Sequence, residues 1–310
     1  MKKRVIITGP TGAVGMALIQ KCINEKTEVL ALCHKGSKRI ADIPKNPFVT
    51  VKETDLSEFR ELQPDENEKY DMMFHFGWMG TTGAARNDMD LQCRNIAYTI
   101  DAVRLAQRFG CKTFIGAGSQ AEYGRTEKNL TSQTPAFPEN GYGMAKLCAG
   151  EMSRGLCQQL GMKHIWTRIL SVYGPYDGPY TMISSAIRTM LEGKRMAFTA
   201  GEQKWDYLYS RDAAEALWKL GEHGIDGKVY VLGSGSIQTL KEYILEIYRA
   251  VLEVNPNAGR PCFGEIPYAD GQVMYLGADI RELTEDTGFL PNISFEDGIR
   301  ETIAGMRADG

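Results

Sequence analysis

A glycine-rich segment near the amino terminus restricts the fold of this chain more than any other feature. The segment reads Thr8-Gly-Pro-Thr-Gly-Ala-Val-Gly15, and it lies between an apolar run typical of a strand and a helical pattern. Gly9 permits a tight turn, Gly12 lets the backbone approach a ligand, and Gly15 allows close packing of helix against strand. Free N–H groups at the start of such a helix attract phosphate. The segment therefore predicts a strand–loop–helix unit that binds the pyrophosphate of a dinucleotide.

Apolar runs and helical patterns alternate through the first half of the chain. Strands are predicted at residues 4–8, 28–33, 48–52, 71–76, 112–116 and 164–170. Helices are predicted at residues 14–24, 88–109 and 141–160. This alternation indicates parallel strands joined by crossover helices, in a sheet that binds ligands at the carboxyl ends of its strands. We therefore expect an α/β fold in which residues 1–172 form a Rossmann-type, doubly wound parallel sheet that binds a dinucleotide.

The pattern loosens after residue 172. Turn residues fill positions 174–179, and helices are predicted at 181–191, 212–223 and 240–252, with two short helices between 279 and 306. We expect residues 173–310 to form a smaller α/β part that closes over the sheet edge and mainly binds the substrate. Because the chain can cross between the two parts more than once, the boundary at residue 172 is approximate.

Composition and charge argue against several other classes of protein. The net charge of −3 is not the basic balance of a nucleic-acid-binding protein. No apolar stretch is long enough to predict a membrane span, and the first apolar run is broken at Thr8-Gly9-Pro10, too early for a signal peptide. Seven cysteines without a CxxC pair indicate reduced thiols and a cytoplasmic protein. No metal site is predicted, because the histidines are isolated, at His34, His75, His164 and His223.

The end of the second predicted strand bears on the choice of cofactor. An acidic residue there usually binds the ribose of NAD, but this segment has none. The segment instead carries basic side chains that can bind a 2′-phosphate, at His34, Lys35, Lys38 and Arg39. NADP is therefore favoured, with NAD still possible; the alternative is a solvated basic loop. Asp55 and Leu56 follow the third strand and are expected near the adenine, although Asp55 would equally suit a helix cap.

Three polar residues lie after the fifth predicted strand and at the start of the helix predicted at 141–160. Ser119 follows the fifth strand, and Tyr142 and Lys146 lie one turn apart on the next helix. Together with the glycine loop, residues 119–124 and 142–146 resemble the extended short-chain dehydrogenase/reductase family, whose members mostly act on nucleotide-diphosphate sugars. Further segments that resemble this family span nearly the whole chain, at 95–99, 168–175, 205–212, 288–291 and 296–300.

The resemblance implies a role for each of the three residues. Tyr142 would exchange a proton with a sugar hydroxyl or ketone, and Ser119 would bind the same oxygen. Lys146, together with the cationic nicotinamide of the oxidised cofactor, would lower the pKa of the phenol, and it would also bind the nicotinamide ribose. The expected contacts of the cofactor are Gly9, Thr11, Gly12, Ala13, Val14, Gly15, Phe76, Gly77, Leu170, Tyr142 and Lys146. The expected contacts of the substrate are Trp78, Arg86, Gln120, Ser171 and Trp205. Trp78 would either stack on a sugar ring or fill the core.

Several positions depart from the family pattern. Gln120 and Ala121 replace the Asp-Glu pair of the 4,6-dehydratases, so elimination of water is disfavoured. Glu122 follows them and could be a substrate contact or a loop carboxylate, and the second interpretation is slightly preferred. Ser171 and Trp205 replace an Asn and an Arg, respectively. A further Arg, which usually holds the pyrophosphate, is replaced by Ala269, so the carrier of the sugar is left open.

These observations lead to one principal function and two alternatives. The principal one is an NAD(P)-dependent nucleotide-sugar oxidoreductase that reduces or epimerises at C4 through a 4-keto sugar. The alternatives are a carbonyl reductase of a small, non-nucleotide ketone and a non-catalytic NADP-binding sensor. The helices predicted at 88–109 and 141–160 pair into a four-helix bundle in similar dimers, so the resemblance implies a homodimer. Periodicity alone would also let these helices pack internally.

Overall fold

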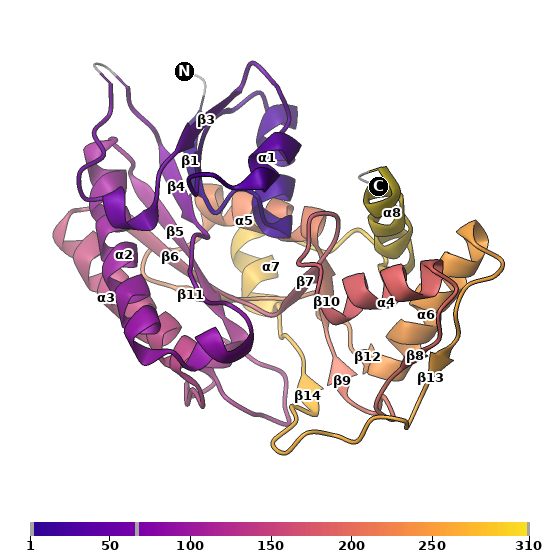
Figure 1. Cartoon of the computed structure of the whole chain (residues 1–310). Coiled ribbons are helices and arrows are strands. Elements are labelled where there is room, and N and C mark those ends of the chain that lie inside the picture. Colours follow the sequence, from indigo (N-terminus) through magenta and orange to yellow (C-terminus); the bar gives the residue numbers. More distant parts are fainter. Residues whose placement is uncertain (1–2, 66–67, 309–310) are drawn as a thin grey trace.

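A parallel sheet of seven strands forms the centre of the larger part of the molecule (Figure 1). The computed structural model describes residues 3–65 and 68–308. In spatial order, the strands are β11 (Val229–Leu232), β6 (Lys163–Ile169), β5 (Thr113–Ser119), β4 (Met72–His75), β1 (Arg4–Thr8), β2 (Glu28–Cys33) and β3 (Val49–Glu53). The order reverses between β1 and β4, and at such a switch point the strand ends open into a crevice. The predicted Rossmann-type, doubly wound sheet is confirmed.

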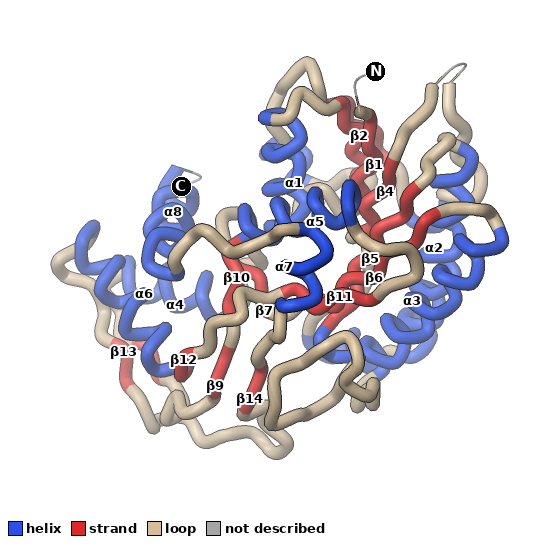
Figure 2. The backbone as a smooth tube through the Cα atoms, turned by 180° about the vertical axis from the view of Figure 1, so that it is seen from behind, coloured by secondary structure: helices blue, strands red, loops and turns tan. Residues whose placement is uncertain are grey.

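Helices cover both faces of this sheet, as Figures 1 and 2 show. One face carries α1 (Ala13–Asn24), α5 (Ser210–His223) and α7 (Arg281–Thr287), and the other carries α2 (Met89–Arg108) and α3 (Gly141–Gln159). Consecutive residues of β1 therefore belong to different cores. Val5 and Ile7 pack on the α1 side and Ile6 on the α2 side, and all three are fully buried. Each such side chain contributes about 1.5–3 kcal/mol through burial.

The predicted strands and helices of the first 172 residues are all present, and the largest displacement is at the end of β5. The pattern predicted that this strand would end at Gly116, whereas it continues to Ser119. Glycine is usually unfavourable within a strand, because it leaves no side chain to pack. Here the ring of Trp166 lies against Gly116 and Gly118 and takes the place of their side chains.

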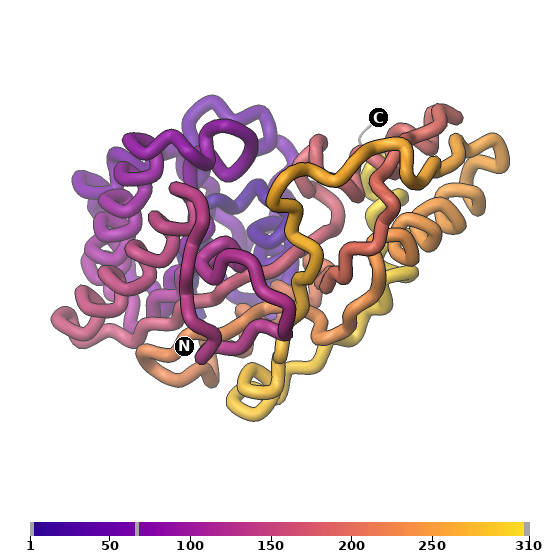
Figure 3. Tube along the Cα trace, turned by 90° about the horizontal axis from the view of Figure 1, so that it is seen from below, coloured from indigo at the N-terminus to yellow at the C-terminus, as the bar shows by residue number. Residues whose placement is uncertain are grey.

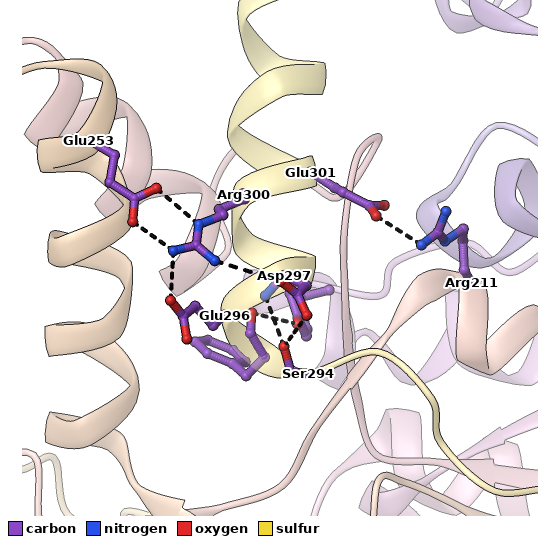
Figure 4. A network of polar contacts seen from close by, with 9 residues as sticks. Arg211, Glu253, Ser294, Glu296, Asp297, Arg300 and Glu301 are labelled. Carbon is purple, nitrogen blue, oxygen red and sulfur yellow. Dashed lines mark hydrogen bonds and ion pairs between the residues drawn. The ribbon is translucent and has the colours of Figure 1, made fainter.

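The smaller part of the molecule, whose backbone trace lies beside the larger part in Figure 3, has a separate apolar core. Its helices are α4 (Met182–Leu191), α6 (Leu240–Val254) and α8 (Phe295–Ala308). Its short strands are β7 (Ser171–Tyr173), β8 (Met196–Ala197), β9 (Lys204–Trp205), β10 (Tyr207–Tyr209), β12 (Gln238–Thr239), β13 (Pro261–Cys262) and β14 (Tyr275–Leu276). Arg300 of α8 joins the helices by donating two hydrogen bonds, of 2.9 and 2.7 Å, to Glu253 of α6 (Figure 4).

The chain crosses between the two parts more than once. After β10 it returns to the main sheet, where α5 packs on α1 and β11 pairs with the edge of β6. The sequence analysis missed β11, although its residues Val-Tyr-Val-Leu, bounded by Gly227 and Gly233, form a local strand signal. Within the described residues, no helix combines the length and apolar character needed to cross a bilayer.

Candidate active site

The glycine loop between β1 and α1 is tightly packed. Gly9 has a φ of +64°, and a Cβ atom added there would lie 2.8 Å from the backbone nitrogen of Gly77. A Cβ atom added to Gly15 would lie 2.6 Å from the carbonyl oxygen of Gly9. The N-cap of α1 is Gly12, and no side chain caps it, so the first N–H groups of the helix are free to bind a ligand. The geometry fits the pyrophosphate cradle predicted from the sequence.

The loop after β4 is fastened to the end of β1. The Thr8 hydroxyl accepts hydrogen bonds from the N–H groups of Phe76 and Gly77, at 3.1 and 3.0 Å, and contacts Nδ1 of buried His75 at 2.8 Å. These contacts hold together the two strand ends that flank the switch point. Phe76 and Gly77 thus lie beside the glycine loop, where the sequence placed them.

A cavity of about 420 Å³ extends from this switch point toward β3. Its lining includes Gly9, Leu32, Asp55, Leu56, Gly77 and Tyr98. Asp55 also caps the short helix η2 (Leu56–Glu58), which confirms the helix-cap interpretation, and its contact with the adenine stays a prediction. The cavity and the glycine loop have the shape and the backbone donors that a dinucleotide requires, and the residues present fit such a cofactor.

The basic loop after β2 is opposed by carboxylates. His34 Nδ1 lies 2.6 Å from an Asp55 oxygen, and the Lys35 ammonium contacts Glu58. The N–H of Gly36 donates to Glu53 at 2.9 Å. In addition, the guanidinium of Arg39 donates to a backbone carbonyl, and Lys38 is exposed. The loop is therefore less positive than its own sequence suggests, because its neutralising partners come from β3 and η2.

The three candidate catalytic residues meet beside this crevice. Ser119 ends β5 and caps the short helix η4 (Gln120–Glu122). Tyr142 lies in the first turn of α3 and is hydrogen-bonded to Ser119. Lys146 lies one turn further, is only 4% exposed, and donates a hydrogen bond of 2.6 Å to the carbonyl of Ala117. The structure thus brings the predicted trio together.

Two further side chains from the sequence prediction pack on this trio. The Trp78 ring lies 3.8 Å from the Lys146 ammonium and meets the Tyr142 ring edge-on, with centroids 6.1 Å apart. The Arg86 guanidinium stacks on the Tyr142 ring, 4.3 Å from its centroid. Trp78 also lines the cofactor cavity, and its indole N–H donates to Gln92 at 2.9 Å. It is therefore anchored at the site and does not simply fill the core.

Burial controls the ionisation of this cluster. It lowers the pKa of Lys146 to about 7, although the nearby Glu122 carboxylate opposes the shift. Burial also raises the pKa of Tyr142, against the opposing effects of the Ser119 hydrogen bond and the Arg86 charge. The sequence-based expectation was a pKa of Tyr142 lowered by Lys146 together with the cationic nicotinamide of the bound cofactor. In the protein alone, desolvation of the phenol outweighs the nearby charges, and the effect of the nicotinamide stays a prediction.

The interpretation of Glu122 as a loop carboxylate is wrong. Its side chain is fully buried and accepts hydrogen bonds from Arg168 Nε at 2.7 Å, from Trp166 Nε1 at 3.1 Å and from the Ser119 N–H at 2.8 Å. One sequence signal points to this pair. An arginine within the apolar strand β6 requires a buried acidic partner, and Glu122 supplies it.

The predicted substrate contacts lie on several elements. The indole N–H of Trp205, on β9, donates to the Ser171 hydroxyl, on β7, at 2.8 Å, so two departures from the family pattern contact each other. Gln120 is half-buried at the start of η4, and Leu170 is buried directly after β6. Sequence reasoning did not single out Arg125, which lies 3.3 Å from the position of a Cβ atom added to Gly271, two residues after Ala269.

Comparisons with known proteins place this geometry in a family. The model of the NAD dependent epimerase/dehydratase family matches residues 5–233. The chain is 25% identical to the UDP-N-acetyl-alpha-D-glucosaminuronate decarboxylase of Bacillus cytotoxicus, over 99% of this chain and 98% of that protein.

Two solved structures are similar to the whole chain. A UDP-N-acetylglucosamine 4-epimerase from Methanobrevibacter ruminantium, in complex with UDP-N-acetylmuramic acid, has a TM-score of 0.87 at 21% identity and full coverage of both chains. DesIV, a dTDP-glucose 4,6-dehydratase from Streptomyces venezuelae with NAD bound, has a TM-score of 0.81 at 19% identity and covers 99% of this chain and 97% of its own. At these identities the likeness shows the fold alone. Because the family model matches most of the sequence, the chain belongs to the NAD-dependent epimerase/dehydratase family, enzymes of the extended short-chain dehydrogenase/reductase type.

Proposed function

We propose that this enzyme oxidises or reduces C4 of a nucleotide-diphosphate sugar, with Tyr142 as the acid/base. The observation that carries the proposal is the hydrogen-bonded pair of Ser119 and Tyr142, with Lys146 one turn away, beside a dinucleotide-type glycine loop. Relatives of this chain are named for reactions on UDP- and dTDP-linked sugars, which supports the substrate class.

The roles of the residues follow from their positions. The nicotinamide, when bound, accepts or donates hydride at the sugar carbon. Tyr142 takes the proton of the sugar hydroxyl during oxidation and returns it to the ketone oxygen during reduction. Ser119 donates a hydrogen bond to the same oxygen and fixes its distance from the phenol. Arg86, stacked on the ring, favours the phenolate, and Lys146 supplies a donor for the cofactor ribose.

The structure offers no acid–base pair for elimination at η4. Gln120 and Ala121 occupy the positions of the dehydratase carboxylates, and the adjacent Glu122 is bound to Arg168. We therefore propose reduction or epimerisation through a 4-keto sugar. An epimerase keeps its cofactor through the cycle and a reductase releases it oxidised, so retention of the nicotinamide absorbance through gel filtration separates the two.

A second candidate, reduction of a small ketone, rests on a different observation. Ala269, Ser171 and Trp205 replace residues that usually bind the pyrophosphate and nucleotide-sugar, and Trp205 and Ser171 bind each other. Arg125, near Gly271 in the same turn as Ala269, offers a cation for the pyrophosphate, although it binds Glu139 at 2.8 Å. We give the nucleotide-sugar precedence because this cation is present.

The choice of cofactor depends on charge at the end of β2. The sequence favoured NADP, but Glu53, Asp55 and Glu58 surround the loop with negative charge. A 2′-phosphate would meet these carboxylates, whereas a ribose 2′-hydroxyl can donate to one of them. We propose that NAD(H) binds more tightly than NADP(H).

One ligand panel tests the substrate class and the cofactor together. NAD⁺ is expected to raise the unfolding temperature more than NADP⁺ at equal concentration, because the ligand with the lower Kd stabilises the folded state more. A ligand at 100 times its Kd stabilises the folded state by about 2.7 kcal/mol. One of UDP, dTDP, CDP and GDP is expected to add to this shift. Stabilisation by no nucleotide would support the small-ketone reductase, and wild-type protein that turns over neither sugars nor ketones would support the sensor.

The outer faces of α2 and α3 suggest how the chain assembles. They expose Met89, Met144 and Met152, each about half accessible, together with Cys93 and Cys148. Such an apolar surface marks an interface, and we propose a homodimer through these helices. Met152→Glu is expected to shift the molar mass in light scattering from two chains to one. Leu290→Glu, at an exposed residue of the other part, is the control and should leave the mass unchanged. Wild-type protein with the mass of one chain would contradict the dimer.

The state of the cysteines bears on the location of the enzyme. All seven cysteines are free thiols in the structure. Because thiols stay reduced in the cytosol, we propose a cytoplasmic location.

A further inference from the structure

Behind the candidate catalytic residues, the Trp166 ring separates α3 from β5. Cβ atoms added to Gly116 and Gly118 of β5 would each lie 2.3 Å from this ring, and one added to Gly150 of α3 would lie 2.7 Å from it. These three glycines therefore leave the space that the indole fills. Gly150 is one helical turn beyond Lys146, so the thickness of the ring sets the distance between the helix of Tyr142 and Lys146 and the strand of Ser119.

The orientation of this ring is set by the buried pair Glu122 and Arg168. The Glu122 carboxylate accepts from Trp166 Nε1 at 3.1 Å and from Arg168 Nε at 2.7 Å. It also accepts from the N–H of Ser119, at 2.8 Å. The Arg168 guanidinium also stacks on the Tyr123 ring, 4.4 Å from the ring centroid. The Glu122 carboxylate thus links the end of β5, the Trp166 ring and the Arg168 side chain of β6.

Stability alone does not explain a buried pair of this kind. Glu122 is fully buried and Arg168 is 5% exposed, and removing two such charges from water costs about as much as their attraction returns. Apolar side chains of the same volume would fill the space equally well. The position of the pair, directly behind Ser119, points to a role in the site.

We propose that Glu122, Arg168 and Trp166 form a positioning unit that holds Ser119 and α3 in the register needed to bind one substrate oxygen between two hydroxyls. The inference rests on the proposed function. None of the three residues contacts the substrate in this scheme, so they act through Ser119, Tyr142 and Lys146. The unit also places the Glu122 carboxylate, paired with Arg168, behind the site, although burial raises the pKa of this carboxyl.

The effect of that charge gives the test its direction. Glu122 raises the pKa of both Tyr142 and Lys146. The other titratable or charged groups that face this pair are Arg86 of η3 (Gly83–Asn87) and His75 of β4, which is buried and uncharged, with a pKa near 3. Because removal of the carboxylate lowers the pKa of both catalytic groups, the limbs of the pH–rate profile should move to lower pH.

Glu122→Gln is the principal variant, since it keeps the shape and removes the charge. We expect kcat to fall about 10- to 100-fold with little change in KM, because a small displacement of reacting groups is costly. The matched control is Asp212→Asn, at another buried carboxylate, which accepts two backbone N–H groups, at 3.0 and 2.9 Å. The control should lose stability but keep the wild-type pH–rate profile. A Glu122→Gln profile that coincides with that of the control would overturn the proposal.

Two further measurements keep the test decisive. Trp166→Phe keeps both charges and loses the indole N–H, so it should lower kcat by a smaller factor than Glu122→Gln while NAD⁺ still stabilises the protein. The pKa of Lys146, followed by NMR with ¹³C-labelled lysine and assigned with Lys146→Met, should fall in Glu122→Gln even if no nucleotide-sugar is turned over. This second readout separates failure of the positioning unit from failure of the proposed substrate. An unchanged Lys146 pKa would contradict the unit directly.

Discussion

Replacing Tyr142 with phenylalanine is expected to lower kcat by about 10²- to 10⁴-fold, the usual contribution of a positioned acid/base. The change removes only the hydroxyl that is hydrogen-bonded to Ser119, while the ring keeps its contacts with Trp78 and Arg86. The glycine loop lies on other elements, so NAD⁺ should stabilise the variant as it does the wild type. The expected result is therefore an enzyme that binds its ligands and does not turn them over.

The measurement is steady-state kinetics on the nucleotide-sugar found in the ligand panel, alongside thermal shift with NAD⁺. Tyr248→Phe, on α6 in the other core, provides a matched loss of one phenol hydroxyl and should behave as wild type. A Tyr142→Phe enzyme that retained more than about a tenth of the wild-type kcat would exclude the phenol as the acid/base.

Lys146→Met is expected to abolish most activity and, unusually, to stabilise the fold. Burial lowers the pKa of this amine from 10.5 to about 7, so the folded state disfavours the charged form. The unfolded chain binds a proton at this group between pH 7 and 10.5 and the folded chain does not, so stability from this group rises with pH across that window. Below pH 7 the folded state bears the full free-energy penalty of burying the charged amine, which is about 1.4 kcal/mol for each unit of difference between the folded and unfolded pKa. Methionine removes that penalty and keeps the volume.

Calorimetric unfolding at pH 6, 8 and 10 measures this effect. The melting temperature of Lys146→Met should exceed that of the wild type most at pH 6, and the gap should close toward pH 10. Loss of activity by about 10²-fold is expected over the same range, because the donor to the cofactor ribose is gone. A variant that melts below the wild type at pH 6 would show that the ammonium is not penalised by burial.

The parts of this protein that could be predicted from sequence depend on local patterns. The glycine loop, the strand–helix alternation and the spacing of Tyr142 and Lys146 each lie within a few turns of backbone. Glu122 was misjudged because its partner Arg168 lies 46 residues away, and only the fold brings the two together. The basic loop was overestimated for the same reason, since the carboxylates that oppose it lie 17–23 residues further along the chain.

Trp78 illustrates a different limit. The sequence left two possibilities for this ring, because the residue follows a strand in an irregular loop where periodicity gives no direction. Gln92 of α2 fixes the ring beside the candidate site by accepting the indole N–H, and its own amide donates to the carbonyls of Gly80 and Ala85, at 3.0 and 2.9 Å. Stacking of the ring on a sugar stays a prediction. A polar side chain buried in a predicted helix, such as Gln92, is the signal that could have located the anchor.

The return of the chain to the main sheet has a consequence for biosynthesis. The outer edge of β6 is covered by β11, and α1 by α5, and both covers are encoded after residue 209. When the first 172 residues have been translated, β6 is therefore an edge strand without its partner, and the apolar face of α1 lacks its cover. At about 5–20 residues per second, some 3–12 s pass before residue 232 is added. During that interval the nascent sheet is a natural client for chaperones that shield strand edges.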